Sequence, residues 1–222
     1  MNKQHLLFDL DGTLINTVPD ITSAINRMTS RLGWSPYSEQ QVAHVIGRGI
    51  SQTIYQLLVQ RFDPSTALKW QQEAVELTQQ AYLTLPMQKT TIYPKVAETL
   101  HYLANSRIKM AVVTNKSQPA AQAVLSHLGI LDYFDAVLGA DQIGCYKPHP
   151  ALLQAGLNKL NATQKTTYFI GDSKTDWQAA RYLSLDLLMV TYGYANGLDV
   201  RQSLPATGYL DHFDDILNWL DY

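Results

Sequence analysis

The sequence predicts an α/β protein with a doubly wound, Rossmann-like parallel sheet and an inserted small α-helical cap domain. Short apolar runs that suit buried strands alternate with segments that suit helices, as in doubly wound sheets. Between residues 17 and 88 this alternation stops, and helix-like segments follow one another without a strand. We therefore expect a core made of residues 1–16 and 89–222, and a cap made of residues 17–88.

The core elements are expected in alternating order. The first strand is an apolar run over Leu6–Leu10 that ends in a glycine turn at Gly12. Later strands are expected at Lys109–Asn115, Ala136–Gly139, Thr167–Asp172 and Leu187–Thr191. Helices are expected between them at Val96–Asn105, Pro119–Leu128 and Pro150–Leu160.

The cap is expected to consist of helices alone. Its four segments are Asp20–Leu32, Gln40–Val45, Ser51–Arg61 and Leu68–Leu83. The chain would cross between core and cap near Thr13–Val18 and Pro86–Tyr93, where Pro19, Pro86 and Pro94 stiffen the backbone.

Composition excludes several classes of partner. The formal charge is −2, and charged residues make up 16% of the chain, so neither nucleic acid nor an anionic membrane surface is an expected partner. No apolar run reaches bilayer-spanning length, and the stretch before Asp9 is too short for a signal peptide. The single cysteine, Cys145, precludes an internal disulfide, which favours a reducing compartment such as the cytoplasm.

Acidic residues mark the ends of two expected strands. Asp9 and Asp11 are two residues apart, so on a strand they would project to the same side, and the two carboxylates would repel each other. A divalent cation removes that conflict, and Mg²⁺ prefers oxygen ligands. Asp172 can supply a further ligand, and Asp176 would lie in the first turn of a following helix.

Phosphate-binding groups are expected at the same edge of the sheet. Thr114 and Asn115 end a strand and offer a hydroxyl and backbone amides, and Lys147 adds a positive charge. A metal and an ammonium together would neutralise a phosphate, so that a carboxylate could approach the dianion. The pattern favours phosphoryl chemistry with an aspartate nucleophile.

Four motifs together resemble the haloacid dehalogenase superfamily of phosphatases, in the subgroup with a helical cap after the first strand. They are Asp9-Leu10-Asp11-Gly12-Thr13, Thr114, Lys147 and Gly171-Asp172-Ser173-Lys174-Thr175-Asp176. Within that superfamily the chain is most similar to the phosphoglycolate phosphatases. That similarity is carried by Val113-Thr114-Asn115-Lys116, Lys147-Pro148-His149-Pro150 and Thr191-Tyr192-Gly193-Tyr194-Ala195-Asn196-Gly197.

The resemblance implies a role for each matching residue. Asp9 would be the nucleophile that forms an aspartyl phosphate, and Asp11 the acid, later the base, for the leaving oxygen and for water. Magnesium would be held by Asp9, the backbone carbonyl of Asp11, and Asp172, with Asp176 near it. The substrate would be a small phosphate ester, foremost phosphoglycolate.

Substrate choice is expected to depend on the cap. Gly47-Arg48-Gly49 resembles the cap loop of that family, and Arg48 could bind a substrate carboxylate, although a plain surface role fits it equally well. Asn16 and Thr17 depart from the family pattern, which more often has an acid and a serine there. Neither departure is expected to affect catalysis.

Other functions remain open at this stage. A pyrophosphatase, a sugar phosphatase or a β-phosphoglucomutase-like phosphotransferase would share this core. A phosphorylatable receiver domain also combines acids, a hydroxyl residue and a lysine, but it would need no inserted helical cap. A catalytically silent binding protein is a further alternative, although none of the core groups is missing.

Overall fold

The computed structural model describes residues 3–84, 87–195 and 198–220, so Pro86, expected at a crossing between core and cap, lies outside the described residues. The chain divides into two compact units. One contains the residues up to Asn16 and those from Thr91 onward, and the other runs from Thr17 to Thr90.

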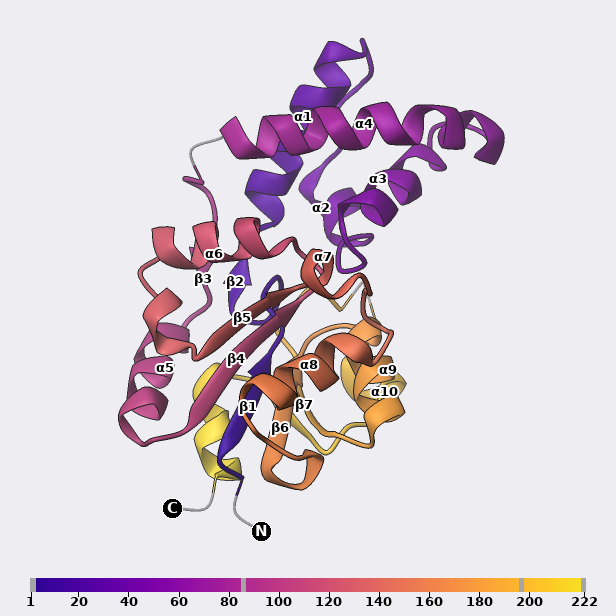
Figure 1. The fold of residues 1–222 in the computed structure, drawn as a ribbon. Coiled ribbons are helices and arrows are strands. Elements are labelled where there is room, and N and C mark those ends of the chain that lie inside the picture. Colours follow the sequence, from indigo (N-terminus) through magenta and orange to yellow (C-terminus); the bar gives the residue numbers. More distant parts are fainter. Residues whose placement is uncertain (1–2, 85–86, 196–197, 221–222) are drawn as a thin grey trace. The chain divides into compact units, whose positions relative to one another are not determined.

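The first unit is built on a parallel sheet with the strand order β5-β4-β1-β6-β7-β8 (Figure 1). These strands span His5–Phe8 (β1), Lys109–Thr114 (β4), Ala136–Gly139 (β5), Thr167–Gly171 (β6), Asp186–Val190 (β7) and Gly208–Leu210 (β8). The predicted doubly wound α/β fold is confirmed. The edge strand β8 was not anticipated, because three residues give too short a pattern to recognise.

Strand β1 lies in the middle of the sheet because its apolar side chains are buried on both faces. Phe8 packs against the rings of Phe134 and Phe213, whereas Leu7 belongs to the apolar cluster on the opposite face. Such continuous burial is typical of a parallel strand covered by helices on both sides. Alternate side chains thus anchor the sheet in two separate cores.

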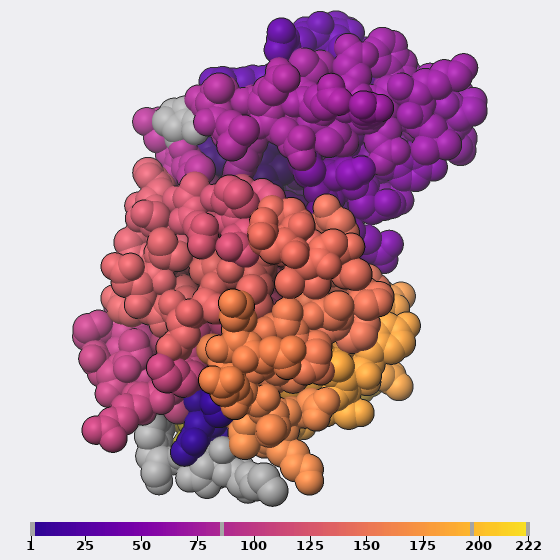
Figure 2. Space-filling model, in the orientation of Figure 1, coloured from indigo at the N-terminus to yellow at the C-terminus, as the bar shows by residue number. Residues whose placement is uncertain are grey.

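Helices connect the strands and cover the sheet. They are α5 (Val96–Asn105), α6 (Gln118–His127), α7 (Ala140–Ile143), α8 (Ala151–Lys159), α9 (Lys174–Leu183) and α10 (Val200–Ser203), with 3-10 turns at Leu131–Tyr133, Gln164–Thr166 and Phe213–Trp219. Helix α8 packs on β1, β4 and β5, and α9 packs on β6 and β7. In Figure 2 the central strands are largely hidden behind the side chains of these segments.

The winding of the chain fixes where a ligand can bind. From β1 the chain adds β4 and β5 on one side, and then returns to add β6, β7 and β8 on the other. The winding therefore reverses around β1, next to β4 and β6. In open parallel sheets the crevice at such a reversal, outside the carboxyl ends of the strands, is the usual ligand site.

A two-stranded antiparallel ribbon lies where the two chain crossings were expected. Strand β2 (Ile15–Asn16) pairs with β3 (Thr91–Ile92), and the N–H of Tyr93 donates to the carbonyl of Leu14. The sequence predicted stiff crossings there but no strands. Pairing satisfies the backbone groups of both crossings.

The second unit is helical. Its helices are α1 (Val18–Arg31), α2 (Glu39–Ala43), α3 (Ile50–Leu58) and α4 (Pro64–Thr84), and α4 packs against both α1 and α3. Trp34 stacks edge-on against Phe62 and Trp70. The buried carboxylate of Asp20 accepts hydrogen bonds from the N–H groups of Lys89 and Thr90 and from the Thr90 hydroxyl, which fastens the end of this unit to α1.

Among the described residues, no helix is both long enough and apolar enough to cross a membrane.

Candidate active site

Asp9 and Lys147 form a buried ion pair at the reversal point. Asp9 directly follows β1, and its N–H donates to the carbonyl of Ile170 in β6. The Nζ of Lys147 lies 2.7 Å from Oδ1 of Asp9, 2.8 Å from Oδ1 of Asp176 and 3.0 Å from the carbonyl oxygen of Val113. The side chain of Lys147 is 1% exposed, so its charge acts in a medium of low dielectric constant.

Asn115 positions this lysine. Its Nδ2 donates to the carbonyl of Lys147, and its Oδ1 accepts from the N–H of Lys147, at 3.0 and 2.7 Å. The side-chain amide of Asn115 is thus engaged with the backbone of Lys147, whereas the predicted phosphate contact of Asn115 involves its backbone amide and stays a prediction. The hydroxyl of Thr114, the other predicted phosphate ligand, accepts the N–H of Lys116 at 3.2 Å. A hydroxyl that accepts one hydrogen bond can still donate another.

Asp172 is enclosed by backbone on two sides. Its Oδ2 accepts the N–H of Tyr194 at 2.8 Å. A Cβ added to Gly12 would lie 2.3 Å from that same Oδ2, and one added to Gly193 would lie 2.3 Å from the Cβ of Asp172. Gly12 also has φ +92°, in the region that favours glycine. The two glycines therefore let two loops close on Asp172 and fix its carboxylate.

Asp176 has both a structural and an electrostatic contact. It caps helix α9 in a reciprocal capping box: its Oδ2 accepts the N–H of Ser173, and the Ser173 hydroxyl accepts the N–H of Asp176. Its Oδ1 lies 2.8 Å from the Lys147 ammonium, and in the part of the chain that the structure describes no hydrogen bond reaches this oxygen, so the contact is mainly electrostatic.

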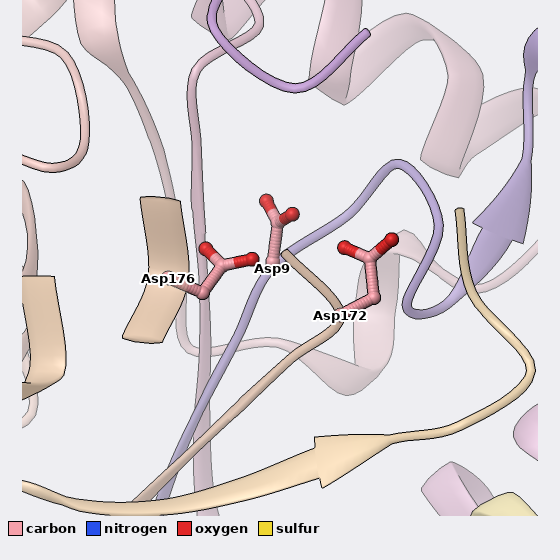
Figure 3. Close-up of side chains that lie close together, drawn as sticks. All are labelled: Asp9, Asp172 and Asp176. Carbon is pink, nitrogen blue, oxygen red and sulfur yellow. The ribbon is translucent and has the colours of Figure 1, made fainter. Parts of the chain in front are cut away.

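Three carboxylates converge at this point (Figure 3). Each of Asp9, Asp172 and Asp176 places a carboxylate oxygen within 4.8 Å of the other two, and all three residues are buried. Asp11, expected beside Asp9, instead directs its carboxylate to Lys116, with Nζ 3.1 Å from Oδ1 and 3.2 Å from Oδ2. Strand β1 ends at Phe8, so the two-residue alternation does not extend to these acids.

The cluster is electrostatically strained. Burial, together with repulsion from Asp176 and Asp11, raises the pKa of Asp9 to about 7, despite the opposing attraction of Lys147. Burial and repulsion from Asp176 and Asp9 also raise the pKa of Asp172 well above its usual value. Burial alone would lower the pKa of Lys147, but attraction to Asp176 and Asp9 raises it, so the lysine stays charged.

The donor set fits a hard divalent cation. It consists of buried carboxylate oxygens that repel one another, and within residues 3–84, 87–195 and 198–220 no hydrogen bond reaches Oδ1 of Asp176. Buried polar atoms in folded proteins are nearly always satisfied, so a buried carboxylate oxygen whose contact is the Lys147 ion pair has room for a further cation, as in a metal site. Carboxylate oxygens are the ligands that Mg²⁺ prefers.

Arg48 belongs to the second unit. It is exposed and stands between Gly47 and Gly49, whose φ angles are +116° and +83°. Its predicted contact with a substrate carboxylate stays a prediction. Asn196 and Gly197, in the stretch that resembled the phosphoglycolate phosphatases, lie outside the described residues.

Sequence reasoning gave no role to Lys116, Gly193 or Tyr194. The hydroxyls of Tyr192 and Tyr194 donate to the Thr13 carbonyl and to Oδ1 of Asn16, respectively. Their positions in the sequence could have indicated a role. Lys116 follows the end of β4 by two residues, and Gly193 and Tyr194 follow β7. Residues just beyond the carboxyl ends of the central strands lie near the site.

This arrangement defines a class of α/β enzyme, in which a buried aspartate after the first strand shares a site with a lysine and further acids. Comparison with known proteins then identifies the family. The family model for haloacid dehalogenase-like hydrolases matches residues 6–190. The chain therefore belongs to the haloacid dehalogenase-like hydrolase family, as its motifs predicted.

Similarity to individual proteins extends over the full length. The chain is 35% identical to a phosphoglycolate phosphatase of Psychrobacter arcticus, covering 100% of this chain and 96% of that protein. It is 37% identical to one from Pectobacterium atrosepticum, with 96% and 90% covered. The predicted assignment to the hydrolytic enzymes is confirmed.

Solved structures agree with this fold. A crystal structure of a predicted phosphoglycolate phosphatase from Haemophilus somnus has 30% identity and a TM-score of 0.82, with 97% of each chain covered. CbbY from Rhodobacter sphaeroides, crystallised with phosphate, has a TM-score of 0.82 and covers 100% of both chains. At 22% identity, that second match supports the fold alone.

Proposed function

We propose that this enzyme is a magnesium-dependent phosphatase that hydrolyses a small phosphate monoester, foremost 2-phosphoglycolate, through an aspartyl phosphate at Asp9. The main support for the proposal is the buried Asp9 carboxylate. Its Oδ1 lies 2.7 Å from Nζ of Lys147, beside two further buried acids. The full-length similarity to phosphoglycolate phosphatases at 35 and 37% identity supports the choice of substrate.

In this proposal each residue of the core has a distinct task. Asp9 attacks phosphorus, and Lys147 offsets the negative charge that would otherwise keep a carboxylate and a phosphate apart. Thr114 and the backbone of Asn115 donate to phosphate oxygens. Asp11 gives a proton to the leaving oxygen and later accepts one from the water that hydrolyses the aspartyl phosphate, so one carboxyl group serves both halves of the reaction.

Magnesium would be held by Asp9, Asp172 and the backbone carbonyl of Asp11, with Asp176 next to it. When bound, Mg²⁺ supplies positive charge that neutralises both the carboxylates and the phosphoryl group. The strained, buried carboxylates of the metal-free cluster support this assignment.

The helical unit from Thr17 to Thr90 is proposed to be the cap that selects the substrate, with Arg48 as a ligand for a substrate carboxylate. The reaction is proposed to take place in the cytoplasm, since a chain with one cysteine needs no oxidising compartment.

The test is a panel of phosphate compounds with and without Mg²⁺. It contains 2-phosphoglycolate, ethyl phosphate, p-nitrophenyl phosphate, pyrophosphate and a hexose phosphate, with Asp9→Asn as the blank. We expect phosphate release that needs Mg²⁺, is highest with 2-phosphoglycolate, and is lost in Asp9→Asn. No release from any ester would refute the proposal. A preference for pyrophosphate or hexose phosphate, or formation of a sugar phosphate isomer, would select one of the other superfamily activities.

A further inference from the structure

Lys116 is nearly buried and makes a two-point contact with Asp11. Its Nζ lies 3.1 and 3.2 Å from the two carboxylate oxygens, and the two side chains are 10% and 15% exposed. The backbone of Lys116 is fixed as well, because its N–H donates to the hydroxyl of Thr114. A lysine held at both ends in this way has a defined position beside the site.

The two lysines of the site contact different acids. Lys147 contacts Asp9 and Asp176, whereas Lys116 contacts Asp11. If Asp11 protonates the leaving oxygen, Lys116 lies on the leaving-group side of the site, one ion-pair distance from the acid. Lys147 lies on the side of the nucleophile. The two positive charges thus bracket the bond that is proposed to break.

The position of Lys116 brings its ammonium close to the leaving group. Its Nζ lies 3.1 Å from the carboxylate that is proposed to face the ester oxygen, so a substituent on the leaving alcohol would lie near this ammonium. A nearly buried ammonium that gave up its contact with Asp11 would need another anion, because an uncompensated buried charge is costly. A carboxylate on the leaving alcohol, one carbon away from the carbon that bears the ester oxygen, would supply the missing negative charge.

We propose that Lys116 determines specificity on the leaving-group side: it pairs with Asp11 in the free enzyme and with a carboxylate of the departing alcohol in the substrate complex. This inference rests on the proposed function and narrows its substrate class to phosphate esters of short hydroxy acids. The exchange of partners also releases Asp11 to face the ester oxygen.

Equilibrium binding tests the inference without turnover. In the Asp9→Asn background, 2-phosphoglycolate and ethyl phosphate are titrated calorimetrically, because they differ chiefly in the carboxylate. Adding Lys116→Met should weaken the binding of 2-phosphoglycolate by about 10- to 100-fold, as expected for the loss of one charged hydrogen-bonded contact. Ethyl phosphate should change by less than about threefold, since it has no carboxylate to lose.

Matched variants separate specificity from a structural effect. Lys116→Arg should keep most of the preference for 2-phosphoglycolate over ethyl phosphate, because arginine retains the positive charge. Lys109→Met removes another lysine flanking the same strand, at its opposite end, and should leave both affinities unchanged. Thermal melts check that each variant is folded.

Two results would overturn the inference: equal weakening of both ligands in Lys116→Met, or no preference for 2-phosphoglycolate in the parent. These results are distinct from failure of the proposed function, which is the absence of phosphate release from every ester in the wild-type panel. Turnover then adds a second readout. In otherwise wild-type enzyme, Lys116→Met should lower kcat/KM for 2-phosphoglycolate far more than for p-nitrophenyl phosphate, whose leaving group needs little protonation.

Discussion

The ammonium of Lys147 and the carboxylate of Asp9 form an ion pair, 2.7 Å apart, in which the lysine side chain is 1% exposed and the aspartate side chain 10% exposed. The lysine also lies 2.8 Å from Asp176 and donates to a backbone carbonyl at the end of β4. One side chain therefore ties together the ends of β1, β4 and helix α9. Its loss would affect both stability and the electrostatics of the site.

Lys147→Met should destabilise the metal-free protein by about 3–5 kcal/mol, because buried carboxylates are left without their counter-charge. Adding Mg²⁺ should recover part of the loss, since the cation supplies positive charge to the same oxygens. Urea unfolding with and without Mg²⁺ measures both effects. Lys109→Met, which removes an exposed pair with Asp135, is the control and should cost at most about 1 kcal/mol. Equal losses in the two variants would contradict this account.

Gly193→Ala should disturb the metal site through Asp172. The added Cβ would lie 2.3 Å from the Cβ of Asp172 and 2.5 Å from the carbonyl oxygen of Gly12, so one of these groups must move. We expect a loss of about 1–3 kcal/mol in stability and a weaker Mg²⁺ affinity in calorimetric titration.

Gly129→Ala is the matched control for Gly193→Ala. Its Cβ would meet no atom of the described residues within 4 Å, although its φ of +70° carries a conformational cost of about 1 kcal/mol. It should lower stability without changing Mg²⁺ affinity. An unchanged affinity in Gly193→Ala would show that Asp172 tolerates the shift.

Asp172→Asn should separate metal-free stability from metal binding. Removing one of three crowded carboxylates relieves repulsion, so the metal-free protein should be as stable as wild type or more so. The variant should lose the stabilisation that Mg²⁺ gives wild type, which at 100 times the dissociation constant is about 2.7 kcal/mol. Thermal melts over a range of Mg²⁺ concentrations test this. An undiminished Mg²⁺ response in Asp172→Asn would exclude Asp172 as a ligand.

The metal-free protein should become less stable as pH rises from about 4 to about 7. The pKa of Asp9 is about 7 in the folded protein and 3.8 as the ordinary value, so between these limits the folded state binds more protons than the unfolded state. Stability then falls with rising pH, with a slope of up to about 1.4 kcal/mol per pH unit for one group. Asp172 acts in the same direction, because its pKa is raised too.

Urea unfolding at several pH values, in the presence of a chelator, measures this slope. Asp9→Asn removes the ionisable group and should flatten the dependence. Saturating Mg²⁺ should remove or reverse the fall in stability with rising pH, because the cation favours the ionised carboxylates. A stability that rises with pH in the chelated wild type would show that these acids are ionised throughout.

Local sequence patterns were sufficient to predict the parallel sheet. A strand such as Leu6–Phe8 in this kind of sheet is buried on both faces, so its sequence is a continuous run of apolar residues. Because the carboxyl ends of parallel strands meet at one edge, the sequence also indicated that Asp9, Thr114 and Asp172 would lie near one another. It could not indicate the short strand β8 or the β2–β3 ribbon, whose two or three residues carry no periodic signal.

The pairing of the charged groups depends on how the chain packs in three dimensions. Asp9 and Asp11 are neighbours in sequence, yet one carboxylate faces Lys147 and the other faces Lys116, because the chain leaves β1 at Phe8 and turns at Gly12. Asn115 holds Lys147, a residue 32 positions away, through its side-chain amide. Ion pairs and side-chain hydrogen bonds depend on distances of a few ångströms between segments remote in sequence, and such distances are set when the strands and loops pack together. The sequence by itself determined the fold class and the groups available for chemistry, and packing determined how those groups are paired.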